Sequence, residues 1–198
     1  MTKTGGRPRG FDRDVALEQA LTVFWRHGYE ATSIAALTAA MGINAPSLYG
    51  AFGDKRKLFS EAVQRYGQTY GAFGGRALAE ERTAHAAIHR LLHEAAQEYT
   101  DPGHPPGCMF ISAATNCTPA AEDVKAELRV LREATKRAIR EKITADVHAG
   151  RLPASTDAAA LAMFYAATLQ GMSTQACDGA GQGDLERLAE IAMAAWPT

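Results

Sequence analysis

The 198-residue sequence predicts an all-α protein with an N-terminal three-helix helix-turn-helix unit followed by a larger helical domain. Alanine and leucine recur at helical spacing through most of the chain. Two short apolar segments, residues 33–41 and 44–52, are joined through a single glycine, which is the spacing of a helix-turn-helix. A hydrophobic content of 46% is enough to build the core of a globular protein of this length.

The first helix is expected to begin after Asp12, which can act as its N-cap, and to end at His27-Gly28. A second helix is capped by Thr32 or Ser33 and ends before Gly42. The apolar positions of the two helices recur at helical spacing and are Val15, Ala16, Leu17, Ala20, Leu21, Phe24, Trp25, Ile34, Leu37 and Met41.

Asn44 is expected to cap the third helix, and Asp54 a longer fourth helix that starts with Lys55-Arg56-Lys57 and runs to about residue 70. In the third helix, Leu48 and Phe52 are predicted to point inward, and Ser47 and Tyr49 outward. The second helix of a helix-turn-helix, which here is the third helix of the chain, can enter a DNA major groove. The pattern alone also fits an ordinary three-helix bundle.

The charge distribution favours a polyanionic partner for the N-terminal part. Residues 1–66 carry nine Lys and Arg against six Asp and Glu, whereas the remainder carries 12 against 16. A mildly basic front on an acidic body is typical of a domain that binds nucleic acid.

Residues 16–59 resemble the TetR/AcrR family of bacterial transcriptional regulators. The matching positions are Gly28, Tyr29, Thr32, Ser33, Ile34, Gly42, Ile43, Ser47, Leu48, Tyr49, Phe52, Lys55 and Leu58. The resemblance implies a flexible basic arm over residues 1–10, a DNA-binding domain over 11–66, and a helical ligand-binding and dimerisation domain over 67–198.

The resemblance also implies the roles of individual residues toward double-stranded operator DNA. It places Thr32, Ser33, Tyr49 and Lys55 on phosphates, Ala45, Pro46 and Ser47 toward the bases, and Arg7 and Arg9 in a minor groove. Gly50 and Ala51 depart from the family pattern, because relatives often carry a bulky aromatic residue and a His or Tyr there.

The rest of the chain predicts an amphipathic helix over residues 83–100, a long charged helix over 120–150, and two C-terminal helices. The last two correspond to the family's dimer-forming bundle, although both could instead be intramolecular core. The residues expected at the dimer interface are Leu161, Tyr165, Thr168, Leu169, Met172, Leu188 and Ile191.

A small-molecule effector is expected inside the body by the same analogy. The predicted pocket residues are Phe73, Leu92, Cys108, Met109, Phe110, Leu131 and Phe164. A Pro- and Gly-rich loop over residues 101–107 places Cys108 near a helix N-terminus, where the pKa of a thiol is lowered. The alternative is that Cys108 is a small buried apolar residue.

Two further features can be interpreted either as functional or as ordinary parts of the structure. His85, His89 and His93 lie four residues apart, a spacing that can chelate a metal ion or form a pH sensor. No cysteine or acid at a firm spacing completes a metal site, so they are interpreted as solvated residues flanking the apolar face, and no metal is expected. The glycine-rich segment 67–75 is read as fraying before a linker, or alternatively as a flexible joint.

These observations predict a homodimeric repressor released from a palindromic operator by a small hydrophobic ligand. The alternative is a redox- or electrophile-sensing repressor that acts through Cys108. An enzyme is not expected, because no nucleophile elbow, P-loop, dinucleotide fingerprint or H-E-x-x-H motif occurs, and no cofactor is expected. Three cysteines, the polar start and the polar residues within the uncharged segment 158–177 favour a cytoplasmic protein without a membrane span.

Overall fold

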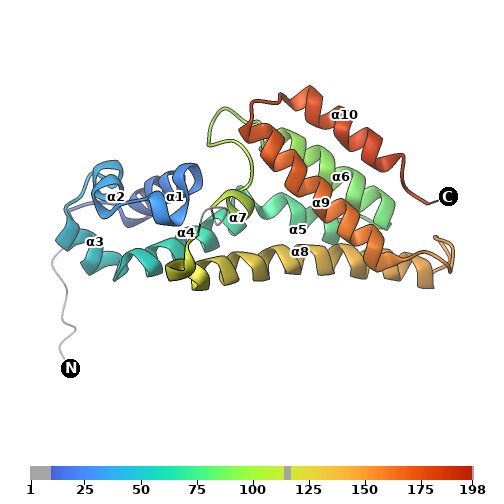
Figure 1. The fold of residues 1–198 in the computed structure, drawn as a ribbon, viewed down its shortest axis with the longest axis horizontal. Helices are drawn as coiled ribbons and strands as arrows, with labels where there is room; N and C mark the ends of the chain where they lie inside the picture. Colours follow the sequence, from blue (N-terminus) through green and yellow to red (C-terminus); the bar gives the residue numbers. More distant parts are fainter. Residues whose placement is uncertain (1–9, 114–116, 198) are drawn as a thin grey trace.

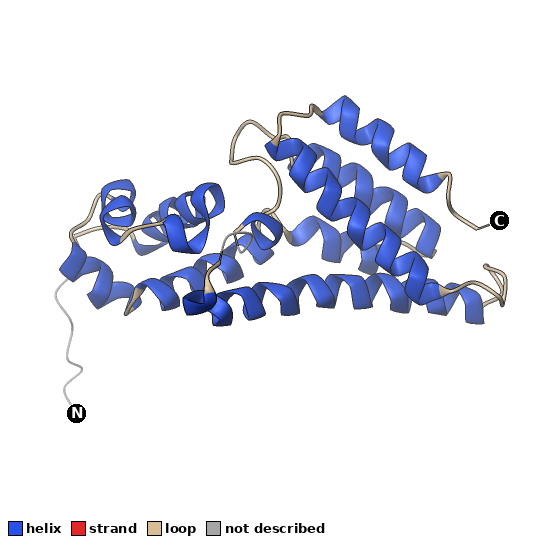
Figure 2. Ribbon diagram, viewed as in Figure 1, coloured by secondary structure: helices blue, strands red, loops and turns tan. Residues whose placement is uncertain are grey.

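The computed structural model describes residues 10–113 and 117–197, and within them every regular element is a helix (Figures 1 and 2). The predicted all-α fold is therefore confirmed. The elements are α1 Arg13–Ala31, α2 Ile34–Met41, α3 Ala45–Phe52, α4 Lys55–Gln68, α5 Ala72–Glu80, α6 Ala84–Glu98, α7 Met109–Ser112, the 3-10 turn η1 Pro119–Ala121, α8 Glu122–His148, α9 Ala158–Cys177 and α10 Gln182–Met193.

Helices α1–α4, here called the front, form one end of the molecule, and α5–α10, the body, form the other (Figure 1). The long helix α8 runs along one side of the body, α9 packs against it and crosses the body, and α10 lies at the opposite side (Figure 1). Among the described residues, no helix combines the length and the apolar character needed to cross a membrane.

The predicted N-caps of the front are confirmed. Asp12 accepts hydrogen bonds from the N–H groups at the start of α1, and Ser33, rather than Thr32, caps α2. Asn44 Oδ1 accepts from the Ser47 N–H at 2.9 Å, and Asp54 caps α4 in the same way. These contacts are local in sequence, which is why the pattern could identify them.

The core of the front forms where α1 and α4 pack together beneath α2 and α3. Leu48 and Phe52 are buried as predicted, and the Phe24 and Phe59 rings meet edge to face with centroids 5.1 Å apart. Val15 shares the apolar pattern of α1 but is 57% exposed. Helix α3 is therefore anchored in the core by Leu48 and Phe52, and its opposite face is exposed.

The reading of residues 67–75 as fraying before a linker is wrong. Gly74 and Gly75 lie inside α5, and α4 gives way to α5 after only three residues, 69–71. A Cβ atom on Gly71 would lie 2.9 Å from the Tyr66 ring. This glycine therefore permits a close turn between two packed helices.

An ion-pair cluster links the front to the body. Arg56, at the start of α4, pairs with Asp123 and with Glu127 of α8, the latter at 2.7 Å. Trp25 of α1 stacks on His104, with ring centroids 4.6 Å apart. Movement within the body can therefore reach the front through direct contacts.

Candidate nucleic-acid interface and effector cavity

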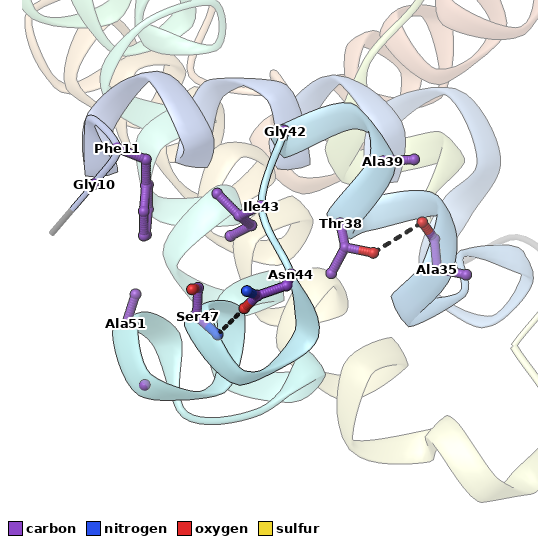
Figure 3. Close-up of a pocket in the computed structure, with 11 residues that line it drawn as sticks. Gly10, Phe11, Ala35, Thr38, Ala39, Gly42, Ile43, Asn44, Ser47 and Ala51 are labelled. Carbon is purple, nitrogen blue, oxygen red and sulfur yellow. Dashed lines mark hydrogen bonds between the residues drawn. The ribbon is translucent and has the colours of Figure 1, made fainter.

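An open groove of about 1160 Å³ lies on the front between α2, α3 and the start of α1 (Figure 3). It is lined by small side chains, hydroxyls and backbone, namely Gly10, Phe11, Ala35, Thr38, Ala39, Gly42, Ile43, Asn44, Ser47, Gly50 and Ala51. Such a surface offers methyl groups and hydrogen-bonding atoms, which are the two kinds of contact that base edges make in a major groove.

The residues expected to face the bases lie in the first turn of α3. Ser47 lines the groove, and its N–H is already accepted by Asn44 Oδ1 (Figure 3). Pro46 is exposed and Ala45 is half-buried, and neither lines the groove. Gly50 and Ala51, which depart from the family pattern, line it and leave it wide.

Two of the residues expected to contact phosphates present their hydroxyls to solvent, and one does not. Ser33 is exposed and accepts the Ala36 N–H, so its own hydroxyl hydrogen stays available to a phosphate oxygen. Tyr49 is 48% exposed. Thr32 is only 1% exposed, and its hydroxyl donates to the Gly28 carbonyl at 2.6 Å. The side chain of Thr32 therefore faces the protein.

The three basic residues at the start of α4 have different surroundings. Lys55 Nζ lies 4.4 Å from the centre of the Tyr29 ring, and burial lowers the pKa of its ammonium group. Arg56 pairs with α8, as described above. The Lys57 side chain is 72% exposed, and its Nζ lies 3.9 Å from Asp54 Oδ2. The resemblance predicted a phosphate contact for Lys55 but not for Lys57. Arg7 and Arg9, predicted to reach a minor groove, lie outside the described residues.

The body contains a cavity of about 270 Å³ between α4, α5, α6, α7, α8 and α9. Its lining residues are Tyr66, Gly71, Phe73, Gly74, Gly75, Leu78, Leu91, Tyr99, Cys108, Phe110, Ala134, Thr135, Ala138 and Leu169. A second pocket of about 60 Å³ shares Tyr99, Cys108, Phe110, Thr135 and Leu169 with it and adds Arg132 and Gln170. The Tyr66 hydroxyl is buried beside the Cys108 thiol.

Three of the seven predicted pocket residues line this cavity, namely Phe73, Cys108 and Phe110. Leu92 and Met109 are instead fully buried in the core. Leu131 is half-buried away from the cavity, and Phe164 is 43% exposed on α9. Helical spacing marks a residue as apolar but cannot tell a cavity wall from solid core. The sequence pattern did not identify Tyr66 and Tyr99 as lining residues.

Of the two interpretations of Cys108, the small buried residue is confirmed and the lowered pKa is wrong. The thiol is 8% exposed, and burial raises its pKa because a thiolate loses its hydration there. Hydrogen bonding from Tyr66, Phe110, Ile111 and Tyr99 acts in the opposite direction without reversing the rise. Helix α7 is one turn long, so it provides little helix dipole.

Helix α7 connects the cavity to the front. Phe110 in α7 lines the cavity, and one residue beyond the helix the Ala113 carbonyl accepts the Tyr29 N–H at 3.3 Å. Glu30, next to Tyr29, accepts hydrogen bonds from the N–H and hydroxyl of Thr118. Tyr29 in turn lies against Lys55 of α4.

The residues expected at the dimer interface divide into buried and accessible sets. Tyr165, Leu169 and Met172 are buried within the protomer, whereas Ile191 is 71% exposed. Leu161, Thr168 and Leu188 are half-buried. Met163 and Phe164 are also exposed, so α9 and α10 carry three of the six large exposed apolar side chains in the described chain.

Two family models match the chain. Residues 16–62 match the model described as bacterial regulatory proteins, tetR family, and residues 84–177 match the tetracyclin repressor-like C-terminal domain. The first match covers α1 to the middle of α4, and the second covers α6 to α9. The two matches therefore correspond to the front and the body.

Curated relatives and solved structures support the same family as the two family models. The HTH-type transcriptional repressors ComR and BdcR of Escherichia coli K12 are 34% and 32% identical over 98% and 90% of this chain, and over 93% and 85% of their own lengths. A cysteine mutant of the TetR family regulator CifR, complexed with 26-base-pair operator DNA, has a TM-score of 0.93 at 42% identity, covering 97% of this chain and all of that one. A TetR regulator from Chloroflexus aurantiacus J-10-FL shares the fold at 20% identity, with a TM-score of 0.79 and 92% of both chains covered. The chain belongs to the TetR family of transcriptional regulators.

Proposed function

We propose that the protein is a homodimeric transcriptional repressor that binds a palindromic operator and leaves it when a small, largely apolar effector enters the body. The observation that carries the proposal is the groove of the front, formed by the first turn of α3 and the outer face of α2. Its support from relatives is the CifR complex, since that protein was captured on operator DNA. A regulator of this kind acts where the chromosome is, in the cytoplasm.

Ser47 and the neighbouring start of α3 would read base edges, while Ser33, Tyr49, Lys55 and Lys57 hold the phosphates. The hydroxyls of Ser33 and Tyr49 are accessible. Lys55 and Lys57 both lie in the first turn of α4. Few base-edge hydrogen bonds are available from alanine and glycine, so the shape of the DNA contributes to specificity. Thr32 acts by holding Gly28 in place.

A second copy of the chain would pack on α9 and α10. Met163, Phe164 and Ile191 are exposed there, and exposed large apolar side chains gathered on two adjacent helices mark an isologous contact. A two-fold axis through this face would place two copies of α3 for successive major grooves, roughly 34 Å apart.

The effector would occupy the cavity around Cys108 and Phe110. At about 270 Å³ the cavity suits a compact compound, and the buried Tyr66 hydroxyl beside the Cys108 thiol supplies one polar contact. Filling it displaces Phe110, and α7 passes the movement to Tyr29 of α1. The effector need only favour the conformation in which the two fronts no longer match the operator.

Fluorescence anisotropy tests the DNA-binding part directly. The reduced protein is titrated onto labelled DNA from upstream of its own gene at two salt concentrations, with random DNA as competitor. Saturable binding that outcompetes random DNA is expected. Binding to every upstream fragment no tighter than to random DNA would contradict the repressor assignment.

The effector site is tested with compounds that release the labelled DNA. Tyr66→Phe should raise the concentration required for half-release, because it removes the polar contact in the cavity. Tyr165→Phe is the matched control, since Tyr165 is equally buried but donates to the Ala192 carbonyl. An equal effect of both variants would exclude the cavity around Tyr66 as the effector site.

A second mode of release is a covalent reaction at Cys108, favoured by the position of this thiol in both pockets. The thiolate sulfur would add to the β-carbon of an unsaturated carbonyl compound, and the α-carbon would take up a proton. Cys108→Ser should then keep repression and lose release by such electrophiles. Retained release in this variant would exclude the covalent route.

A further inference from the structure

Two histidines of α6 and one glutamate of α10 converge at the contact between these helices. His89 and His93 are one helical turn apart, and their rings stack with centroids 4.2 Å apart and planes at 19°. Glu190 Oε1 lies 3.0 Å from His93 Nε2 and 3.6 Å from His89 Nε2. One atom from each of the three residues lies within 4.8 Å of the others.

We propose that His89, His93 and Glu190 bind one divalent transition-metal ion of the zinc class. Two imidazoles and a carboxylate are a donor set that Zn²⁺ accepts, with bonds of about 2.0 to 2.2 Å. Tetrahedral coordination at that bond length separates neighbouring ligand atoms by about 3.3 Å. The two distances to Glu190 fall on either side of this value, and the three ligand atoms lie within 4.8 Å of one another, so side-chain rotations that bring the two histidine nitrogens together would complete the site.

The surroundings leave these side chains free to adjust. His93 Nδ1 has no hydrogen-bond partner among the described residues, so the ring is oriented by Glu190 and by stacking on His89. Glu190 and His89 have side chains 62% and 44% exposed, which gives an ion access from solvent. His85 is set apart, since its ring is 6.4 Å from that of His89 and packs on Trp196.

A bound ion would fasten α10 to α6 within the body. Three protein ligands leave a fourth position for water, as in zinc sites that are not closed by protein alone. The competing explanation is an ion pair between Glu190 and a protonated histidine, which needs no metal. The two explanations differ in whether a metal binds with defined stoichiometry.

The test uses reduced, full-length protein freed of metal by a chelator and titrated with Zn²⁺ or Co²⁺ in a calorimeter. One ion per protomer is expected, and the melting temperature should rise by roughly 5 to 10 °C at about 100 times Kd. Co²⁺ should give the visible bands of a four- or five-coordinate nitrogen and oxygen site, without an intense sulfur-to-metal band.

Glu190→Gln and His93→Gln should each lower the affinity by roughly tenfold or more. Glu186→Gln, one turn earlier on α10, and His148→Gln, an exposed histidine of α8, are matched controls that should change nothing. Glu190 is exposed, so its substitution leaves folding intact. Absence of binding would leave the ion pair as the explanation. A sulfur-to-metal band, or unchanged affinity in Glu190→Gln and His93→Gln, would place the metal on other ligands. Each of these outcomes would overturn the proposal. DNA binding is not the readout, so failure of the repressor assignment would not affect the result.

Discussion

The Tyr29 N–H donates a 3.3 Å hydrogen bond to the Ala113 carbonyl, and this contact joins the end of α1 to the segment that follows α7. Three residues before Ala113, Phe110 lines the cavity, while the Tyr29 ring lies beneath the Lys55 ammonium group. The cavity and the proposed phosphate contacts are thus separated by one short helix and one aromatic ring.

Gly28→Ala should lower the free energy of unfolding by about 1 to 3 kcal/mol in urea denaturation. Gly28 has φ 74° and ψ 174°, a conformation open almost only to glycine, and an added Cβ would lie 3.3 Å from the Ala113 oxygen. Gly75→Ala is the control, since it is helical with nothing within 4 Å. Equal effects of the two substitutions would refute the argument.

Thr32→Val should cost about 1 kcal/mol of stability and leave the salt dependence of DNA binding unchanged. The variant keeps the shape of the buried side chain but removes the hydroxyl that donates to Gly28. Chemical denaturation and anisotropy together measure both effects. A weaker salt dependence at unchanged stability would instead assign Thr32 to a phosphate.

Lys55→Ala and Tyr49→Phe should weaken binding to operator and random DNA alike, and Lys55→Ala should reduce the salt slope by about 1. Ser47→Ala should chiefly blur sequence preference, because its hydroxyl lies in the groove. Competition anisotropy separates the two behaviours. The same loss of specificity from all three variants would overturn these roles.

Alkylation of Cys108 should be slow at neutral pH and should keep accelerating above about pH 8.5, where an unperturbed thiol levels off. The reason is that burial raises its pKa, so less reactive thiolate is present at any given pH. A protein with Cys117→Ser and Cys177→Ser isolates the reaction, and glutathione is the reference. A plateau at or below the pH found for glutathione would contradict the assignment.

Ile191→Glu should raise the dimer dissociation constant by tenfold or more, equivalent to about 1.4 kcal/mol, in analytical ultracentrifugation. The substitution places a charge on the exposed apolar face of α9 and α10. Val130→Glu is the control, because Val130 is similarly exposed but lies on α8. If both variants remain dimeric, the interface lies elsewhere.

The sequence by itself determined the helical fold, the N-caps Asp12, Asn44 and Asp54 of the front, the inward face of α3 and the family. Each depends on residues a few positions apart, such as Asn44 and Ser47, so the pattern contains both partners of the interaction. Only the tertiary structure decided that Thr32 faces inward, that Tyr66 and Tyr99 rather than Leu92 border the cavity, and that Glu190 meets two histidines of α6. It also decided the direction of the Cys108 pKa, because burial depends on helices that approach from distant parts of the chain. A helical period specifies which side of a helix is apolar, but packing alone determines what that side touches.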